Sequence, residues 1–284
     1  MLTGGIEAGG TKFVCAVGKG SGEIIDKVTF PTTTPDETLR RVRDYFSEFS
    51  IRAIGIGSFG PVDLDKKSTS YGTILHTPKQ QWRQFDLLTA MKEYVQVPLF
   101  LDTDVNAAAL GEYKYGVAQK DQSCLYITVG TGIGAGFVKD GVTYQGKSHP
   151  EMGHIMIQKH TDDYFAGICP SHGACLEGLA SGPAIEKRYG KKAELLASHK
   201  EVWELEAFYL AQAIINYTLV LSPERVIIGG GVMKQHELYQ RIRNYFSQLM
   251  NNYVELGNLE DFITAPTLSD EQGIKGAIAL TYME

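Results

Sequence analysis

The sequence lacks the features that would suit a nucleic-acid surface, a membrane or an oxidising compartment. Acidic residues outnumber basic ones, 33 to 27, and the formal net charge is −6, whereas a nucleic-acid surface needs a basic face. No apolar run approaches the length of a membrane span, and no basic segment precedes an apolar one as in an export signal. Only four cysteines are present, of which Cys15 and Cys124 lie in apolar runs. We therefore expect a cytoplasmic protein that binds neither nucleic acid nor membranes.

The 284 residues, with 43 % hydrophobic and 21 % charged side chains, fit two domains or one large α/β unit. Apolar patterning predicts strands at residues 2–8, 11–17, 23–30, 51–57, 98–101, 124–129, 136–139 and 225–228. Helical patterning predicts one helix that begins at Pro35. It predicts further helices at about residues 85–94, 106–115, 202–221, 235–251 and 273–282. Residues 63–81 are polar and predict a loop or hairpin.

Two segments share one pattern. IEAGGTKFVCAVG, from residue 6, and ITVGTGIGAGFVKDG, from residue 127, both read as strand, Gly/Thr turn, strand. This similarity indicates an internal duplication with its boundary near residues 117–122. We expect an N-terminal domain at 1–118 and a C-terminal domain at 119–284, with the last helix packing back on the first domain.

Glycine turns follow three of the predicted strands. Consecutive glycines let the backbone approach a ligand closely and turn N–H groups toward an anion. The GTGIGAG segment loosely fits a dinucleotide fingerprint, but its glycines lead into a strand, whereas that motif requires a helix. No glycine run continues into Gly-Lys-Ser/Thr, so a Walker loop is absent. Together the three turns favour a phosphate held between two half-similar domains over three plain turns.

A cluster of metal-binding side chains lies between residues 151 and 177. Cys169, His172 and Cys175 follow a C-x-x-H-x-x-C spacing, and His154 lies a short loop upstream. Two thiolates and two imidazoles suit a closed tetrahedral zinc site. The alternatives are a disulfide, which a chain without an export signal disfavours, and His160 as the upstream ligand. His160 lies in a run typical of a solvated loop, so we favour His154.

The sequence resembles the ROK family (repressor, ORF, kinase) of sugar kinases along its whole length. The resemblance is carried by GIEAGGTK at the N-terminus, GPVD at 60–63, TDVNAAALGE at 103–112, GTGIGAGF at 130–137, EMGH at 151–154, CPSHGACLE at 169–177 and IIGGGV at 227–232. Within the family, bacterial fructokinases are most similar. The resemblance implies a two-domain α/β fold of the actin-like ATPase (ribonuclease H-like) class, with duplicated sheet and helix halves and a small zinc-binding loop.

The resemblance also implies the sugar site. Asp104 would be the general base that accepts a proton from the attacking sugar hydroxyl, while Asp102 is a rival that residue chemistry alone does not separate from it. The substrate-binding residues implied are Thr103, Asn106, Glu151, His154 and Glu177. One ring nitrogen of His154 would bind zinc and the other would face the sugar.

The same resemblance implies that ATP and Mg²⁺ bind, with zinc in a structural role. The nucleotide-binding residues would be Gly9, Gly10, Thr11, Lys12, Gly130, Thr131, Gly132, Pro183, Gly229, Gly230, Gly231, Val232 and Met233. The zinc ligands would be His154, Cys169, His172 and Cys175. Mg²⁺ would bridge the β- and γ-phosphates and keep most of its waters.

Two positions depart from the family pattern. Glu7 stands where most relatives have Asp, which leaves the Mg²⁺ arrangement open. Thr103 stands where ROK glucokinases have Asn, and the loss of that amide favours fructose over glucose. We therefore expect an ATP-dependent fructokinase that makes fructose 6-phosphate, and we expect a homodimer by analogy.

The alternatives to a fructokinase are a broad hexokinase (mannokinase or glucokinase), a non-catalytic sugar sensor and a sugar-responsive repressor. A repressor would need a helix-turn-helix ahead of the first strand, which is predicted to begin at residue 2.

Overall fold

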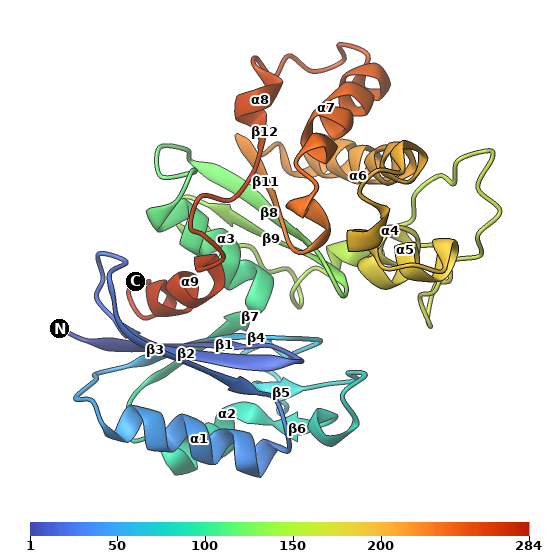
Figure 1. Ribbon diagram of the computed structural model, residues 1–284. Coiled ribbons are helices and arrows are strands. Elements are labelled where there is room, and N and C mark those ends of the chain that lie inside the picture. Colours follow the sequence, from blue (N-terminus) through green and yellow to red (C-terminus); the bar gives the residue numbers. More distant parts are fainter. Residues whose placement is uncertain (284) are drawn as a thin grey trace. The chain divides into compact units, whose positions relative to one another are not determined.

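The computed structural model describes residues 1–283 and contains two five-stranded mixed sheets (Figure 1). The first sheet has the order β3-β2-β1-β4-β7. Strand β1 pairs antiparallel with β2 and parallel with β4, which pairs parallel with β7. These strands are β1 (Thr3–Ala8), β2 (Lys12–Gly18), β3 (Ile24–Pro31), β4 (Ile54–Ser58) and β7 (Leu99–Thr103).

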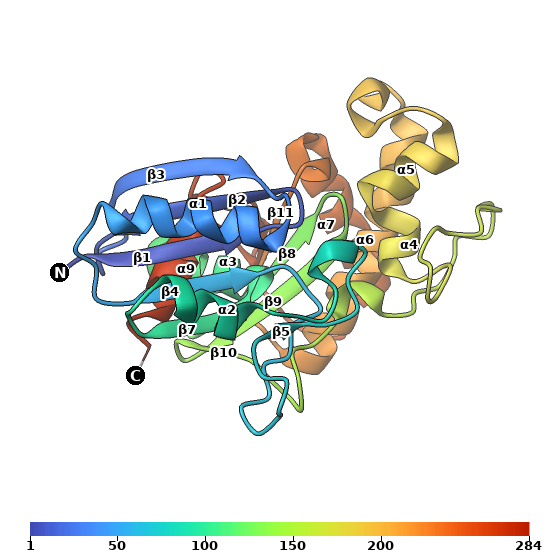
Figure 2. The ribbon, with the colours of Figure 1, turned by 90° about the horizontal axis from the view of Figure 1, so that it is seen from below.

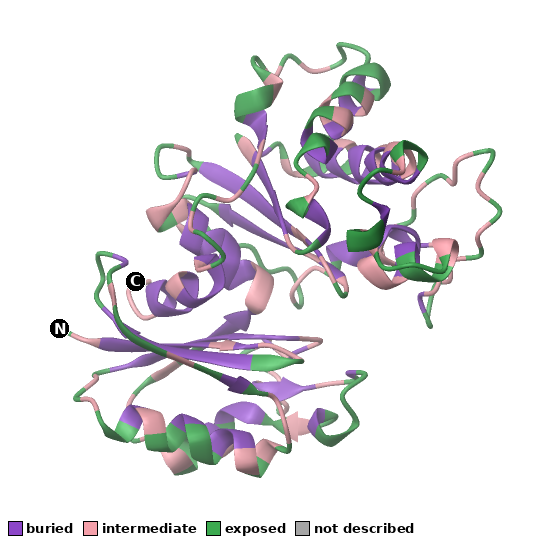
Figure 3. Ribbon diagram, in the orientation of Figure 1, coloured by how far each residue is buried: buried purple, intermediate pink, exposed green. Residues whose placement is uncertain are grey.

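Helices cover both faces of the first sheet (Figures 1 and 2). One face carries α1 (Pro35–Ser47) and α2 (Leu87–Tyr94), and the other carries α3 (Asp104–Tyr115) and α9 (Gln272–Leu280). Helix α1 begins where the sequence predicts, because the Thr34 hydroxyl accepts from the Glu37 amide and Pro35 fits the first turn. Its inward stripe of Leu39, Val42 and Phe46 is buried, and the opposite side is exposed (Figure 3).

Helices α3 and α9 cross at very short range. A Cβ on Gly276 of α9 would lie 1.6 Å from the carbonyl oxygen of Ala107 on α3, and one on Gly111 would lie 2.2 Å from the Gln272 carbonyl oxygen. Only glycine allows the two backbones to approach this closely. The last helix is thereby fixed against the first sheet and α3, where the Val14–Ile274–Ile278 contacts complete the core.

The second sheet, β10-β9-β8-β11-β12, repeats the order and the strand directions of the first. Its strands are β8 (Ser123–Val129), β9 (Ile133–Lys139), β10 (Val142–Thr143), β11 (Arg225–Gly229) and β12 (Ile263–Thr264). The repeated topology confirms the predicted duplication. The predicted start of β9 at residue 136 is wrong, because the Gly130 amide donates to the Gly132 carbonyl and closes the turn there, so the strand starts at Ile133.

The remaining helices are α4 (Leu176–Ala180), α5 (Gly182–Tyr189), α6 (Lys200–Leu221), α7 (Glu237–Met250) and α8 (Leu259–Phe262). Single-turn helices are η1 (Gln80–Trp82), η2 (Met152–His154), η3 (Ala193–Leu196) and η4 (Val232–Lys234), and β5 (Thr73–Ile74) pairs with β6 (Phe85–Asp86). The helices α4 and α5, which meet at Ser181, were not predicted from the sequence. The Ser181 hydroxyl accepts from the Ala184 amide and caps α5, and Pro183 occupies its first turn.

The chain divides into two compact units. The first consists of 1–123, 136–150 and 267–284, and the second of 124–135 and 151–266. The division predicted at residues 118 and 119 is a single cut, whereas these units are each made of several segments. Within residues 1–283, no helix is both long enough and apolar enough to cross a membrane.

Candidate functional site

The strands β1, β4 and β7 end at one edge of the first sheet. In the register of β1, β4 and β7, Ala8 pairs with Ser58 and Ser58 pairs with Thr103, so these last residues lie level. Neighbouring strands are about 4.8 Å apart, which places the Gly9-Gly10 turn about 10 Å from Asp104. The carboxyl ends of parallel strands are the usual place for a ligand in an open α/β sheet. The first unit therefore brings the predicted first phosphate loop and the predicted base to one edge.

The Gly9-Gly10 turn is held by short hydrogen bonds and leaves its outer residues open. The Gly9 amide donates to the Lys12 carbonyl at 3.0 Å, and the Thr32 hydroxyl donates to the Gly9 carbonyl at 2.6 Å. A Cβ on Gly9 would lie 2.7 Å from the Lys12 carbonyl oxygen, so the turn requires glycine there. Thr11 and Lys12 are exposed and face solvent beyond it.

The structure separates Asp102 from Asp104. Asp102 is 2 % exposed, and its two oxygens accept from the Thr103 amide (2.7 Å), the Asn106 amide group (2.7 Å) and the Thr143 hydroxyl (2.6 Å). Burial raises the pKa of the Asp102 carboxyl, and these three donors act against that rise. Asp104 is half-buried at the first position of α3, where one carboxylate oxygen accepts from the Val105 amide at 2.9 Å. Asp102 is thus a buried acceptor, and Asp104 is the more accessible carboxylate.

Two further predicted substrate residues are tied to this end of α3. Thr103 is the N-cap, and its hydroxyl oxygen accepts from the Asn106 amide at 3.1 Å. Asn106 is 2 % exposed, and its side-chain amide donates a hydrogen bond to Asp102. These contacts fix the direction in which α3 presents Asp104.

Thr143 of β10 was not predicted from the sequence as a residue that supports the site. It is a buried threonine in a two-residue strand, 41 residues from Asp102 in the chain, and no motif marks it. Its partnership with Asp102 exists only because the fold brings β10 to the start of α3.

In the second unit, the four predicted zinc ligands converge. The donor atoms of His154, Cys169, His172 and Cys175 all lie within 4.8 Å of one another. Cys169 Sγ is 3.6 Å from His154 Nδ1 and 3.7 Å from His172 Nδ1, and Cys175 Sγ is 3.6 Å from His154 Nδ1. With Zn–S near 2.3 Å and Zn–N near 2.05 Å, a tetrahedral site has an S···N edge of about 3.6 Å. The side chains present therefore fit zinc.

The alternatives to this metal site do not match the structure. All four cysteines are free thiols, so no disulfide forms among them. His160 lies outside the cluster, and its Nδ1 accepts from the Asp162 amide at 3.2 Å.

His154 connects the cluster to Glu177. While Nδ1 points at the two sulfur atoms, Nε2 lies 4.0 Å from Glu177 Oε1. The other Glu177 oxygen accepts from the Ile133 amide at 3.0 Å, and a Cβ on Gly132 would lie 2.7 Å from it. Glu151 is exposed, and its carbonyl accepts from the His154 amide in the first turn of η2. The Nδ1 side of the His154 ring therefore faces the cluster and the Nε2 side faces Glu177, and its double role stays a prediction.

Three predicted nucleotide segments meet at one edge of the second sheet. The Gly182 amide donates to the Gly130 carbonyl at 2.8 Å, which joins the α5 start to the second glycine turn. A Cβ on Gly130 would lie 3.8 Å from the Gly231 amide nitrogen, and one on Gly182 would lie 3.7 Å from the Val232 side chain. Gly230 has a φ of +96° and no room for a Cβ against Val129, so the third loop also depends on glycine.

Glu7, the departure noted on β1, lies against the start of α9. A Cβ on Gly273 would lie 2.8 Å from a Glu7 carboxylate oxygen, so the longer acid fits because residue 273 is glycine. Burial raises the pKa of Glu7, and the charge of Lys12 acts in the opposite direction.

The predicted residues divide between the units. Thr103, Asp104, Asn106 and the first glycine turn (residues 9–12) belong to the first unit. The second holds Glu151, His154, Glu177, the Cys/His cluster, the second glycine turn (residues 130–132), Pro183 and the loop 229–233. Each unit by itself brings together the members it holds.

Comparison with known proteins adds a family assignment. The model of the ROK family matches residues 3–284. A Bacillus subtilis (strain 168) protein named "Putative fructokinase" is 54 % identical over 285 residues, covering 99 % of this chain and 95 % of the relative. The "Fructokinase" of Pediococcus pentosaceus is 43 % identical, covering 99 % and 97 %. Among solved structures, the ROK hexokinase from Thermus thermophilus has a TM-score of 0.84 at 25 % identity, covering 99 % and 98 %.

Proposed function

The chain belongs to the ROK family, and we propose that it is an ATP-dependent fructokinase that phosphorylates the 6-hydroxyl of D-fructose. The observation that carries the proposal is the edge of the first sheet, where a glycine turn and an accessible carboxylate lie about 10 Å apart. A phosphate on the turn and a sugar hydroxyl beside the carboxylate fill that distance. The whole-length similarity to fructokinases supports the choice of sugar kinase.

Asp104 is the general base of the proposed reaction. Its carboxylate accepts the proton of the 6-hydroxyl as that oxygen attacks the terminal phosphorus of ATP, while the bond from this phosphorus to the β,γ-bridging oxygen breaks and ADP leaves. Its position at the start of α3 and its partial exposure support this role, whereas Asp102 already accepts three buried hydrogen bonds. Asp102, Asn106 and Thr143 hold the start of α3, and so they position Asp104.

Backbone amides of the glycine turns bind the phosphates of ATP, apart from those of Gly9 and Gly130, which donate within their own turns. Residues 9–12 and 130–132 supply the two turns, and Pro183 with 229–233 lines the nucleotide, as the resemblance implies. Mg²⁺ accompanies ATP and neutralises charge on the β- and γ-phosphates. Glu7 is half-buried one residue before the end of β1 and lies against Gly273, so the arrangement of Mg²⁺ beside the first turn stays open.

The sugar hydroxyls are held by Glu151, His154, Glu177, Thr103 and Asn106. The proximity of His154 Nε2 to Glu177 Oε1 supports a shared site for adjacent hydroxyls, since an imidazole and a carboxylate offer complementary donors and acceptors. Zinc, held by Nδ1 of His154 with Cys169, His172 and Cys175, would fix the His154 ring and its tautomer. The role of zinc is structural.

Fructose is favoured over glucose because Thr103 lacks the amide that an Asn would offer. The alternative is a hexokinase that accepts several sugars by the same mechanism. No contact among the described residues favours that alternative. The homodimer and the cytoplasmic location stay predictions.

A coupled assay of ADP release with Mg-ATP tests the proposal by comparing fructose, mannose and glucose on one preparation. We expect rapid turnover mainly with fructose. Similar rates with all three sugars would leave a kinase and refute the specificity argument, and no turnover with any of them would refute the proposed function.

A further inference from the structure

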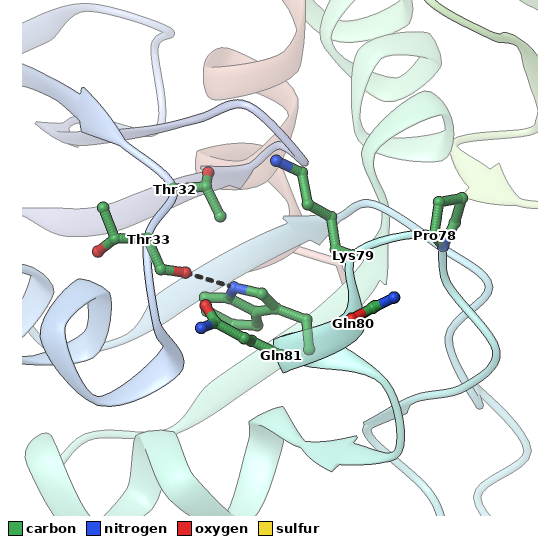
Figure 4. Close-up of a pocket in the computed structure, with 7 residues that line it drawn as sticks. Thr32, Thr33, Pro78, Lys79, Gln80 and Gln81 are labelled. Atoms are coloured by element: carbon green, nitrogen blue, oxygen red, sulfur yellow. Dashed lines mark hydrogen bonds between the residues drawn. The ribbon is translucent and has the colours of Figure 1, made fainter.

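A recess of about 330 Å³ lies beside the first glycine turn and has no role in the site described above. It is lined by Thr32, Thr33, Pro78, Lys79, Gln80, Gln81 and Trp82 (Figure 4). All of these residues belong to the first unit. Thr32 connects the recess to the turn directly, because its hydroxyl donates to the Gly9 carbonyl and its amide donates to the Thr11 carbonyl at 3.0 Å.

The segment that carries Lys79 is firmly anchored. Trp82 is 1 % exposed and packs against the rings of Phe13 and Phe59. It donates its Nε1 proton to the Thr33 carbonyl at 2.8 Å, and this hydrogen bond is the dashed line at Thr33 in Figure 4. The Arg83 guanidinium donates to the Thr77 carbonyl at 3.1 and 3.2 Å. The short helix η1 therefore holds the backbone of Lys79 in a fixed place relative to β1 and β2.

The Lys79 side chain extends over Gly10. A Cβ built on Gly10 would lie 3.7 Å from Lys79 Cε and 4.0 Å from Lys79 Cγ, so the Cε atom is within about 5 Å of the Gly10 Cα. Figure 4 shows the Lys79 side chain extended, with its amino group directed away from Gln81. A surface lysine can lay its aliphatic stem along the protein while its ammonium group stays in water, and the surface that Lys79 follows is the turn expected to bind phosphate.

We propose that Lys79 is a further phosphate-binding residue, whose ammonium group contacts the terminal phosphate of ATP from the open side of the Gly9-Gly10 turn. The proposal rests on the proposed function, which places the transferred phosphate at this turn. The terminal phosphate is the relevant one because the first sheet edge also carries Asp104, and the base and the phosphorus under attack must share one place. A lysine is suited to this role because its ammonium is a compact charge that follows the phosphate as charge shifts during transfer.

The test compares Lys79→Met and Lys79→Arg with Lys92→Met in the full chain. Lys92 is an exposed lysine on α2 that has no part in the site, so its variant matches the change in net charge. Two quantities are measured: kcat/KM with Mg-ATP and fructose, and the ratio of the dissociation constants of ADP and a non-hydrolysable ATP analogue. The melting temperature of each variant confirms that it is folded.

We expect Lys79→Met to lower kcat/KM by about 10- to 100-fold, the loss typical of one charge-assisted phosphate contact. We expect it to weaken the ATP analogue at least fivefold more than ADP, because ADP lacks the terminal phosphate. Lys79→Arg should retain most of both quantities, and Lys92→Met should match the wild type.

Equal weakening of ADP and the ATP analogue, or Lys79→Met values within twofold of Lys92→Met, would overturn the proposal. A lowered melting temperature with an unchanged nucleotide ratio would also overturn it, because it would show a purely structural role. If the wild type phosphorylates no hexose, the proposed function fails, while the nucleotide ratio still decides the role of Lys79.

Discussion

Replacing Asp102 and Asp104 by alanine, one at a time, separates a structural carboxylate from a catalytic one. Asp102→Ala leaves three buried donors without an acceptor, namely the Thr103 amide, the Asn106 side chain and the Thr143 hydroxyl. Each unsatisfied buried donor costs about 1–3 kcal/mol. The change also removes a carboxylate whose burial is unfavourable, as its raised pKa indicates, so the low end of this range applies to each donor. We expect the free energy of unfolding to fall by about 3–4 kcal/mol.

Asp104→Ala removes much less stabilising structure. It removes the acceptor of the Val105 amide and a favourable charge at a helix N-terminus, which together predict a loss of about 0.5–1.5 kcal/mol. Its effect on turnover is the reverse. Loss of a general base lowers kcat by about 10²–10⁴-fold, whereas Asp102→Ala should stay within about tenfold of wild type per folded molecule.

Fluorescence in urea measures the stability of the first unit alone if Trp203 is replaced by Phe. Trp82, which is fully buried in the first unit, then becomes the sole tryptophan of the chain. Turnover comes from ADP release with fructose. The reasoning fails if Asp104→Ala destabilises the first unit as much as Asp102→Ala does, or if Asp102→Ala loses as much kcat as Asp104→Ala.

Four further outcomes are expected. Cys175→Ala should remove zinc from purified protein while His160→Ala retains it, as metal analysis would show; zinc retained by the first variant would contradict the assigned ligands. Thr103→Asn, which keeps an N-cap, should raise glucose turnover relative to fructose, and an unchanged ratio would refute the specificity argument. His154→Gln should lose metal and raise KM for fructose, and an unaltered KM alongside lost metal would refute its double role. Glu206 is fully buried, and one of its carboxyl oxygens has no hydrogen-bond partner. Burial raises the pKa of Glu206 well above 4.5 in the folded state. The protonated form therefore stabilises the fold, and this stability is lost as the pH rises through the folded-state pKa. Glu206→Gln should therefore be more stable than wild type at pH 8, with a smaller difference at pH 5; urea unfolding followed at Trp203 in a Trp82→Phe background would show a constant difference if this is wrong.

Local patterns were enough to predict most of the elements and the metal cluster. The glycine turns, the α1 cap and the C-x-x-H-x-x-C spacing each encode their structure within a few residues, so the sequence indicates them directly. The two helices α4 and α5 were missed because each is at most eight residues long, and they meet at Ser181 without a longer apolar pattern.

Long-range contacts account for what the sequence could not settle. Asp102 and Asp104 are two residues apart in one motif, and their difference depends on Thr143, which comes from another strand. The segments that make up each unit also depend on long-range contacts. The last helix was expected to pack back on the first domain, and α9 belongs to the first unit, but no local pattern marks Gly276 and Gly111 as the positions where its backbone touches α3.

The duplicated sheets also bear on why the proposed reaction uses a single base. Both sheets carry a glycine turn between two neighbouring strands, β1 and β2 in the first sheet and β8 and β9 in the second, so each half has a turn of the kind that the proposal assigns to phosphate. The outer parallel strands differ. Strand β7 runs directly into α3 with Asp104 as its first residue, whereas the two-residue β12 is followed by Ala265 and Pro266 and by no helix until α9. Only the first half therefore places a carboxylate at a helix start level with its glycine turn. Phosphoryl transfer to one hydroxyl needs a single base, and this divergence between the halves supports the proposal that Asp104 of the first unit is that base.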